Sequence, residues 1–180
     1  MEINRSVWLM VLSAYARLAK AHKPEMHPKL GILDGRWLDL KEAELERAFG
    51  CLMEESEQSD FEVRVFLKLL PGFRFAGGNK YLAQDAGVTS VSQMIGTDDF
   101  DPRYPWNRQA AKYRGDDERL IRSGQPVLNI VERQDTPNGV VYLHTSKVPL
   151  GEPGGRSLGL LGMYNLVDTD AAFRLMRSRT

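Results

Sequence analysis

Gly96-Thr97-Asp98-Asp99-Phe100-Asp101 opens the stretch that decides the fold, and Thr145-Ser146-Lys147-Val148-Pro149-Leu150 closes it. Between them, a polar segment that begins near Pro105 has helical character and ends at Ser123-Gly124. Proline suits the first turn of a helix, and glycine suits the position after its last turn. The stretch therefore predicts an acidic loop, one helix, a strand, a turn and a second strand.

Three extended segments are predicted in and beyond the end of this stretch. Residues 127–134 and 140–150 flank Asn138-Gly139, a pair that strongly favours a β-hairpin turn. Residues 157–167 alternate as a third strand. Consecutive strands joined by short turns pair antiparallel, and one face of such a sheet needs a cover. We expect the helices between residues 79 and 123 to supply that cover.

Residues 1–70 are predicted to be mostly helical. Asn4 is a good N-cap for a helix that ends before Pro24, and the wide apolar face of this helix must pack on the domain or on a second copy of the chain. Capping-box patterns at 39–42 and 59–62 predict two further helices, the second of which would end at Pro71-Gly72.

The composition argues against several classes of protein. The 24 Lys and Arg residues balance 24 Asp and Glu residues, so no basic excess indicates nucleic-acid or membrane-surface binding. Cys51 is the one cysteine, which rules out an intramolecular disulfide and fits a reducing compartment. No run approaches the ~20 apolar residues of a membrane span. We therefore expect a cytoplasmic protein without membrane contact and without direct nucleic-acid contact.

The order of these elements, together with several residue patterns, resembles a PAS domain over residues 61–170. The matching positions are Leu70-Pro71-Gly72, Asn79, Gly96 to Asp101, Trp106, Ala110, Tyr113-Arg114, Asp116-Asp117, Ser123-Gly124 and Thr145 to Leu150. The resemblance implies an α+β fold, a PAS-like antiparallel sheet with short covering helices, preceded here by an N-terminal helical extension.

The resemblance divides the chain into three parts. Residues 1–60 form the helical extension and are a candidate dimerisation element, residues 61–168 form the PAS-like sensor domain, and residues 169–180 start an exit helix. The segment 71–79 is too short for the usual first two strands of the family. We expect one of these strands to be truncated or replaced, and residues 30–40 are the candidate replacement.

The function that the resemblance implies is that of a non-catalytic sensory module. Such a module binds a small molecule or a partner and relays its state through flanking helices to an output domain, such as a diguanylate cyclase, a histidine kinase or a helix-turn-helix regulator. The resemblance also implies a homodimer. Two alternatives stay open, a ligand-free interaction or dimerisation domain and a small enzyme of unknown reaction.

A ligand pocket would lie between the covered face of the sheet and the helix that follows Trp106. The candidates for its lining are Asn79, Trp106, Tyr113, Asn129, His144, Lys147 and Tyr164. A core packed solid, with no ligand, is the open alternative. The sequence predicts no catalytic residues and no metal site, because its clustered aspartates suit turns and its three histidines lack ligand spacing. The identity of any ligand or cofactor stays unknown at this point.

Overall fold

The structure is a computed structural model of the 180-residue chain, and it describes residues 3–25, 36–58, 60–151 and 155–179. Its centre is one five-stranded sheet with the strand order β2-β1-β5-β4-β3. Every neighbouring pair in this sheet is antiparallel. The strands are β1 (Arg64–Leu69), β2 (Arg74–Gly78), β3 (Val127–Thr136), β4 (Gly139–Leu150) and β5 (Gly159–Val167).

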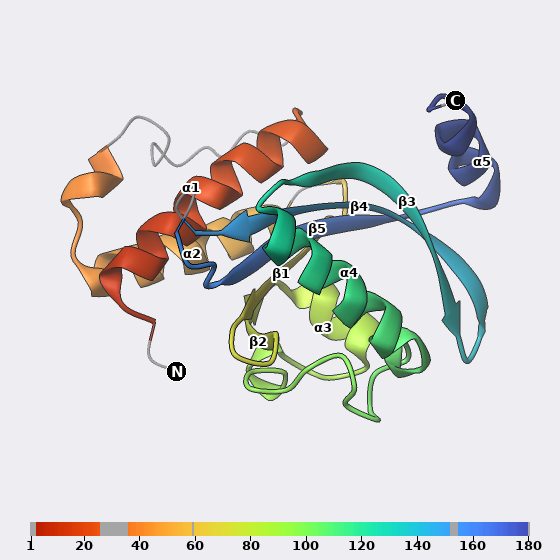
Figure 1. The fold of residues 1–180 in the computed structure, drawn as a ribbon, viewed down its shortest axis with the longest axis horizontal. Helices are drawn as coiled ribbons and strands as arrows, with labels where there is room; N and C mark the ends of the chain where they lie inside the picture. Colours follow the sequence, from red (N-terminus) through yellow and green to blue (C-terminus); the bar gives the residue numbers. More distant parts are fainter. Residues whose placement is uncertain (1–2, 26–35, 59, 152–154, 180) are drawn as a thin grey trace.

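The last three strands pair as the sequence predicts. In the β3–β4 hairpin, Thr136 pairs with Gly139 across a turn that contains Asn138. β5 then returns beside β4, with Leu150 opposite Gly159. The chain therefore has the α+β fold that the sequence predicts, an open antiparallel sheet with helices on its faces (Figure 1).

Short helices cover one face of the sheet, which we call the inner face (Figure 1). They are α3 (Lys80–Ala86), the 3-10 turns η3 (Val91–Gln93) and η4 (Asn107–Gln109), and α4 (Ala110–Ser123). Their apolar side chains form one cluster with the inner side chains of the sheet, and this cluster is rich in aromatic rings. Its members include Phe66, Phe73, Phe75, Leu82, Met94, Tyr104, Trp106, Tyr113, Leu120, Leu143, Leu160 and Tyr164.

The opposite, outer face of the sheet packs against α1 (Arg5–His22) and α2 (Glu42–Glu57). Asn4 caps α1 as predicted, accepting a hydrogen bond from the Val7 backbone N–H. The apolar face of α1 is buried within the chain, and both Val11 and Leu18 have no exposed surface. Of the two predicted options for this helix, packing on the domain is the one that occurs. α5 (Thr169–Arg177) follows the sheet and is capped by Asp168.

The predicted helix at residues 59–70 is wrong, because Arg64–Leu69 form strand β1 and every one of these six residues is buried. A strand buried on both faces carries apolar residues without alternation, so its pattern also fits a buried helix. Arg64 and Lys68 have the spacing of a solvated helix face, but both are ion-paired inside the protein.

β1 supplies the strand that the sequence analysis expected to be truncated or replaced. In the candidate replacement at 30–40, residues 36–39 form the 3-10 turn η2 (Arg36–Asp39), and residues 30–35 lie outside the described residues. The helix predicted from a 39–42 capping box starts two residues later, with Lys41 as N-cap and the Glu44 carboxylate accepting from the Lys41 backbone N–H.

Candidate functional site

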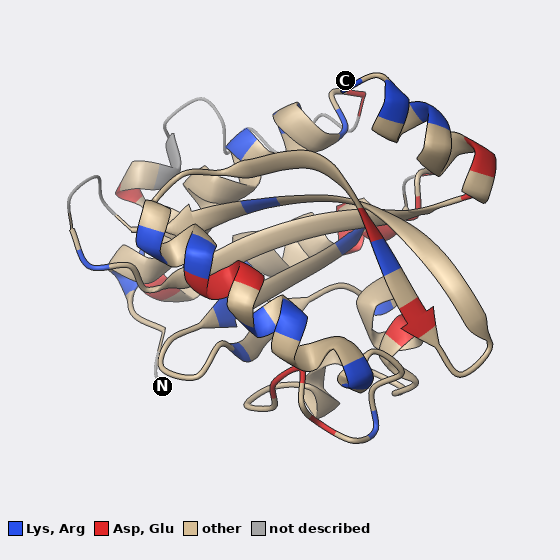
Figure 2. Cartoon of the chain, turned by 45° about the vertical axis from the view of Figure 1, so that its right-hand side comes forward, with Lys and Arg blue, Asp and Glu red and all other residues tan. Residues whose placement is uncertain are grey.

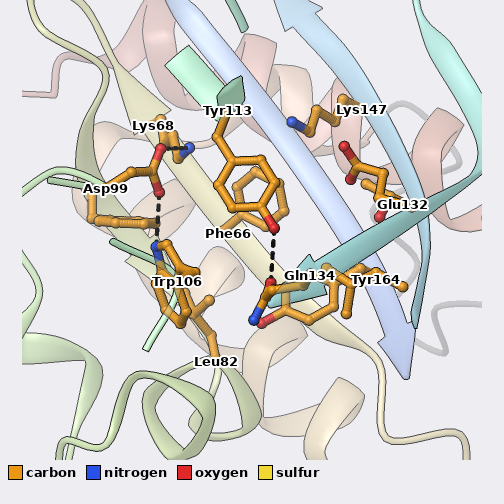
Figure 3. A pocket seen from close by; sticks show the side chains of 13 residues that line it. Phe66, Lys68, Leu82, Asp99, Trp106, Tyr113, Glu132, Gln134, Lys147 and Tyr164 are labelled. Carbon is orange, nitrogen blue, oxygen red and sulfur yellow. Dashed lines mark hydrogen bonds and ion pairs between the residues drawn. The ribbon is translucent and has the colours of Figure 1, made fainter. Parts of the chain in front are cut away.

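A cavity of about 50 Å³ lies between the inner face of the sheet and the helices that cover it. It has room for about three to five water molecules, at about 10–15 Å³ for each. Apolar side chains from both layers form most of its wall, among them Phe66, Leu82, Trp106 and Leu143. Figure 3 shows that the rings of Phe66, Trp106, Tyr113 and Tyr164 surround this space.

A network of buried charges closes one end of the cavity. The Lys68 ammonium group donates to Asp99 Oδ2 at 2.6 Å and to Asp117 Oδ2 at 2.8 Å. Lys147 donates to the other oxygen of Asp117, also at 2.8 Å. The Trp106 indole N–H donates to the other oxygen of Asp99 at 3.1 Å (Figure 3). Two cations and two anions therefore neutralise one another inside the protein.

The pairing in this network keeps Lys68 and Asp117 charged. Burial lowers the pKa of Lys68, but Asp99 and Asp117 outweigh burial, so the pKa is raised above its usual value. Burial raises the pKa of Asp117, and the two lysines outweigh that effect, so this pKa is lowered. Removing one partner of a buried ion pair costs about 3–5 kcal/mol, because the other charge stays in the interior unpaired.

Four separate elements supply the members of this network. Lys68 comes from β1, Lys147 from β4, Asp117 from α4 and Asp99 from the acidic loop at 96–101. The neighbours of Asp99 in the loop have the turn-forming role that the sequence predicts, since Asp98 accepts from the Phe100 backbone N–H at 3.0 Å. The acidic signature therefore has two parts, aspartates that shape the loop and one aspartate that points inward.

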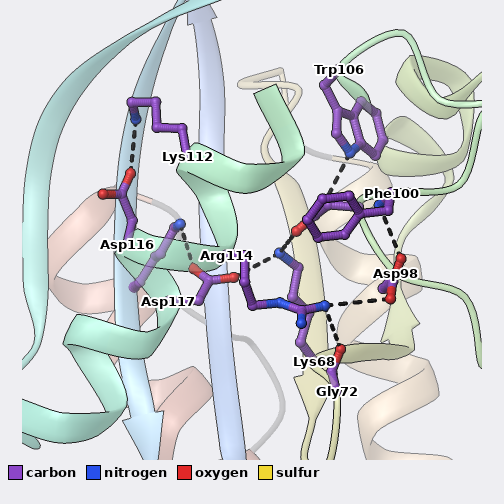
Figure 4. Close-up of polar contacts among 11 residues, drawn as sticks. Lys68, Gly72, Asp98, Phe100, Trp106, Lys112, Arg114, Asp116 and Asp117 are labelled. Atoms are coloured by element: carbon purple, nitrogen blue, oxygen red, sulfur yellow. Dashed lines mark hydrogen bonds and ion pairs between the residues drawn. The ribbon is translucent and has the colours of Figure 1, made fainter. Parts of the chain in front are cut away.

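Arg114 ties α4 to the loop beside the cavity. Its guanidinium group donates to the Gly72 carbonyl at 2.8 Å and to Asp98 Oδ2 at 3.4 Å (Figure 4). The same group lies over the rings of Phe73 and Phe100, at 5.1 and 5.4 Å from their centroids. Each such contact contributes ~0.5–1 kcal/mol, so Arg114 fixes the position of the acidic loop against the helix.

Charges of both signs also line the rim where α4 faces β3. Lys112 bridges Asp116 at 2.8 Å and the nearly buried Glu132 at 3.1 Å. Arg119 pairs with Asp116 from the next turn of the helix. Figure 2 shows basic and acidic residues interspersed along α4. Within this group of four residues, two cations face two anions.

Hydroxyl groups complete the wall of the cavity. The Tyr113 hydroxyl donates to Gln134 Oε1 at 2.9 Å, and the Tyr164 hydroxyl donates to Asp85 Oδ2 at 2.8 Å. Burial raises the pKa of both phenols, so they stay protonated. Thr145 differs from these two: its residue is 2% exposed, it lines the cavity, and its Oγ1 has no hydrogen-bond partner among the described residues.

Four of the seven predicted lining residues border this cavity. They are Trp106, Tyr113, Lys147 and Tyr164. Asn79 lies elsewhere, at the junction of β2 and α3. Its side-chain oxygen accepts from the backbone N–H groups of Val65 and Leu82, and its amide donates to the Ser56 hydroxyl and the Val63 carbonyl. These contacts make Asn79 a cap that joins three elements.

Asn129 and His144, the other two predicted residues, lie on the outer face. The ring of His144 stacks on that of His22 from α1, with 4.9 Å between centroids. Asn129 donates from its side-chain amide to the Ala21 carbonyl at 3.1 Å. Side chains alternate between the two faces along a strand, so a residue between Leu143 and Thr145 has to point away from the cavity. This alternation was available in the sequence.

His22 joins α1 to the sheet through two hydrogen bonds. Its Nε2 lies 2.8 Å from Asn165 Oδ1, and because the Asn165 amide donates to the Phe61 carbonyl, the histidine must donate here. Its Nδ1 lies 2.9 Å from Ser146 Oγ and accepts in the neutral ring. Burial lowers the pKa of His22 to about 4, so the ring is neutral at pH 7.

Several residues of the cavity and of the charge network beside it were missed from the sequence. Lys68 was missed because its segment was predicted as a helix. Asp99 in the cavity wall and Asp117 in the network were missed because aspartates in such patterns usually shape turns. A threonine in a strand has no property that marks it as a cavity residue. Only the alternation of side chains along β4 placed Thr145 on the same face as Leu143. The remaining missed residues are Phe66, Phe75, Leu82, Glu132, Gln134 and Leu143.

No group of three or more His, Cys, Asp and Glu side chains in the described part of the chain could hold a metal ion. No helix among the described residues has both the length and the apolar character that a membrane crossing requires. Cys51 is exposed on α2, away from the cavity.

Comparison with solved structures shows which known proteins share this fold. No protein-family model matches the sequence, and no curated protein matches it significantly. The phage VqmA–DPO complex is 19% identical, with a TM-score of 0.54 over 74% of this chain and 58% of that one. The dimer of Vibrio cholerae VqmA without its target DNA is 21% identical, with a TM-score of 0.52 over 60% of this chain and 47% of that one.

A light-oxygen-voltage domain studied with a flavin analogue is 12% identical to this chain, with a TM-score of 0.50 over 72% of this chain and 93% of that one. The fold is therefore PAS-like, as the resemblance in sequence predicted. This chain spans only about half the length of the VqmA chains that it matches.

One prediction about partners is wrong. Because basic and acidic residues are equal in number, the sequence predicted no direct nucleic-acid contact. The matched VqmA, however, is a LuxR-type receptor with a target DNA. Net charge averages over the whole chain and does not report how charges are distributed locally, so a net charge of zero does not exclude such contact.

Proposed function

We propose that this chain is a non-enzymatic sensory module that binds a small molecule in the cavity under the inner face. The observation that carries the proposal is the cavity itself, an apolar space with a charge-balanced network at one end. In its wall lies the hydroxyl of Thr145, which no other described residue contacts by a hydrogen bond. Ligand sites in proteins combine mostly apolar walls with a few placed polar groups. The PAS-like fold and the ligand-bound state of a matched protein support this proposal.

β4 offers a direct route from the cavity to the outer face. Thr145 and Lys147 line the cavity, and Ser146 between them holds His22 of α1 on the other side of the sheet. A ligand that shifts this part of β4 changes the contact that anchors the C-terminal end of α1. Such a ligand acts by favouring one of two packings of the helix, in proportion to its difference in affinity for them.

The proposal includes a homodimer and an output unit to which the state is relayed, for example a diguanylate cyclase, a histidine kinase or a helix-turn-helix regulator. The dimer of a matched VqmA supports the first part. A dimer contact has to use residues other than the apolar face of α1, since Val11 and Leu18 are already buried in one chain. The charged groups at the cavity pair with one another, and this supports a role without catalysis.

The test is the recovery of a bound molecule. The purified protein is denatured, and small molecules released from it are identified by mass spectrometry. Leu143→Phe fills the cavity and should abolish the recovery, whereas Leu128→Phe adds the same bulk at an exposed position of β3 and should leave it unchanged. Equal recovery from both variants would contradict the cavity as the site.

A second candidate is a ligand-free interaction domain, and the small size of the cavity favours it. A volume of about 50 Å³ is below the ~300–1,000 Å³ of drug-sized ligand sites. This candidate predicts that no molecule is recovered and that Leu143→Phe leaves partner binding intact. The first candidate predicts a small ligand, which fits the same volume.

A further inference from the structure

The last helix, α5, leaves most of its apolar surface uncovered. Of its nine residues, all of them described, one, Ala172, is buried. Phe173 and Met176 lie one turn apart on the helix and are 47% and 38% exposed. A helix of this length is marginal in water unless an apolar face packs against something. Contacts within the chain therefore cover only part of the apolar face of α5.

Apolar side chains of the sheet extend this exposed surface. The ring of Tyr142 on β4 lies 6.0 Å from that of Phe173, and Val140, two residues earlier on the same face of β4, is exposed. Near the other end of the helix, Arg179 donates to the carbonyl of Leu128 on β3, whose side chain is also exposed. We call Leu128, Val140, Phe173 and Met176 the α5 patch. Four of the nine exposed large apolar residues of the described chain therefore lie around one helix, and a concentration of this kind indicates an interaction site.

The charges along α5 indicate what covers the α5 patch. Asp170 lies in the first turn of the helix, and Arg174 and Arg177 lie in its last turn. Figure 2 shows the acidic start of the helix and the basic residues that follow. Asp170, Phe173 and Arg177 have the spacing i, i+3 and i+7, so they lie along one side of the helix with Phe173 between the opposite charges. A second copy of α5 that runs antiparallel is therefore complementary in charge, whereas a parallel copy would place like charges together.

From these observations we infer that the chain forms a two-fold symmetric dimer in which the two α5 helices pack antiparallel. Phe173 lies at the centre of this interface, and Asp170 of each chain faces Arg177 of the partner subunit. A two-fold interface uses the same surface on both chains, and an apolar centre with a polar rim is the usual arrangement. The inference rests on the homodimer of the proposed function and locates its interface, because the apolar face of α1 is already buried within one chain.

Charge reversal tests this arrangement, because two complementary variants of the full chain should restore each other. Asp170→Arg brings arginine against arginine, and Arg177→Asp brings aspartate against aspartate. Each variant alone should dimerise at least about tenfold more weakly than the unchanged protein in sedimentation velocity, since like charges across an interface repel. In an equal mixture, the heterodimer again joins Asp to Arg at both contacts. The mixture should therefore dimerise about as tightly as the unchanged protein.

Two variants of α2 are the matched controls for charge. Glu54→Arg and Arg47→Asp make the same kinds of change at exposed positions, and they should dimerise as the unchanged protein does, alone and mixed. Circular dichroism checks that every variant is folded.

Phe173→Ala tests the apolar centre without altering any charge. Alanine favours the helix, and loss of the ring from both sides of the interface should weaken dimerisation at least about tenfold. Ile95→Ala removes an exposed apolar side chain from another part of the surface and should leave dimerisation unchanged.

Two results would overturn the α5 interface while the homodimer of the proposed function stands. They are a mixture that associates as weakly as its two components, and a Phe173→Ala variant that dimerises as tightly as the unchanged protein. A chain that is monomeric at every concentration would overturn both the interface and the homodimer. Binding of a small molecule in the cavity is decided separately, by the recovery of a bound molecule.

Discussion

The two faces of the sheet are packed in different ways. The outer face is a mainly aliphatic core in which α1 and α2 lie on the strands, and its polar contacts centre on His22. The inner face contains aromatic rings, the network of Lys68, Asp99, Asp117 and Lys147, and a cavity. Aliphatic packing stabilises a single arrangement, whereas buried ion pairs add little net stability and are expensive to break. The comparison indicates that the outer face holds the fold together, and the inner face is where we propose that the ligand binds.

Removing the shared carboxylate of the inner network should have the largest effect. Asp117→Asn leaves both Lys68 and Lys147 without full compensation, and we expect a loss of about 3–5 kcal/mol in the free energy of unfolding. Urea denaturation at pH 7 measures it. Asp116→Asn, one residue earlier in the same helix, removes surface pairs with Lys112 and Arg119 and should cost under about 1 kcal/mol. Equal losses of stability in the two variants would mean that burial does not raise the cost of removing a carboxylate from the inner network.

The outer face should respond to acid through His22. Its pKa of about 4 in the folded protein lies below the usual 6.5, so the unfolded chain binds the proton more readily. Stability is then full above pH 6.5, falls as the pH drops toward 4 and levels off below that, with a loss of about 3 kcal/mol. Burial has the largest effect on the pKa of His22 and lowers it, the hydrogen bond with Asn165 raises it, and His144 and Lys23 lower it further. Burial, Lys23 and Arg179 lower the pKa of His144.

Comparing the unchanged protein with His22→Gln isolates this effect. The variant keeps a polar side chain at the end of α1 but does not titrate, so its stability should change less between pH 6.5 and pH 4 in chemical denaturation. His144→Gln should flatten the curve less, because His144 is only half-buried. An identical pH dependence in the unchanged protein and His22→Gln would contradict a neutral, buried His22.

A pair of glycines distinguishes the two faces with a smaller effect. A Cβ at Gly162 would lie 2.0 Å from Cζ of Phe66, so Gly162→Ala must push this ring toward the cavity, at a cost of about 1–3 kcal/mol. Gly50 in α2 has nothing within 4 Å of the same position, and Gly50→Ala should stabilise the helix by about 0.5–1 kcal/mol. Thermal unfolding gives both values, and a neutral Gly162→Ala would show that the Phe66 ring is free to move.

Sequence reasoning predicted the elements whose signals are local. The Asn4 cap, the Asn138-Gly139 hairpin and the meander of β3, β4 and β5 are each specified by residues close together in the chain. β1 was missed because Lys68 is compensated by Asp99 and Asp117, which lie 31 and 49 residues away. A buried lysine is recognisable only once its partners are known. Because the sequence does not show which side chains meet in space, only four of the predicted lining residues border the cavity, and Thr145 was not among those predicted.

One measurement tests the central claim, that the inner face binds a ligand and β4 carries its effect to the outer face. It is the map of amide chemical shifts across the ¹⁵N-labelled chain on addition of the molecule released from the purified protein. We expect the largest shifts at Thr145 and Lys147 and along α4, with smaller shifts at Ala21 and His22, where Ser146 and Asn129 contact the end of α1. Shifts confined to the outer face, or none around Thr145, would contradict the account.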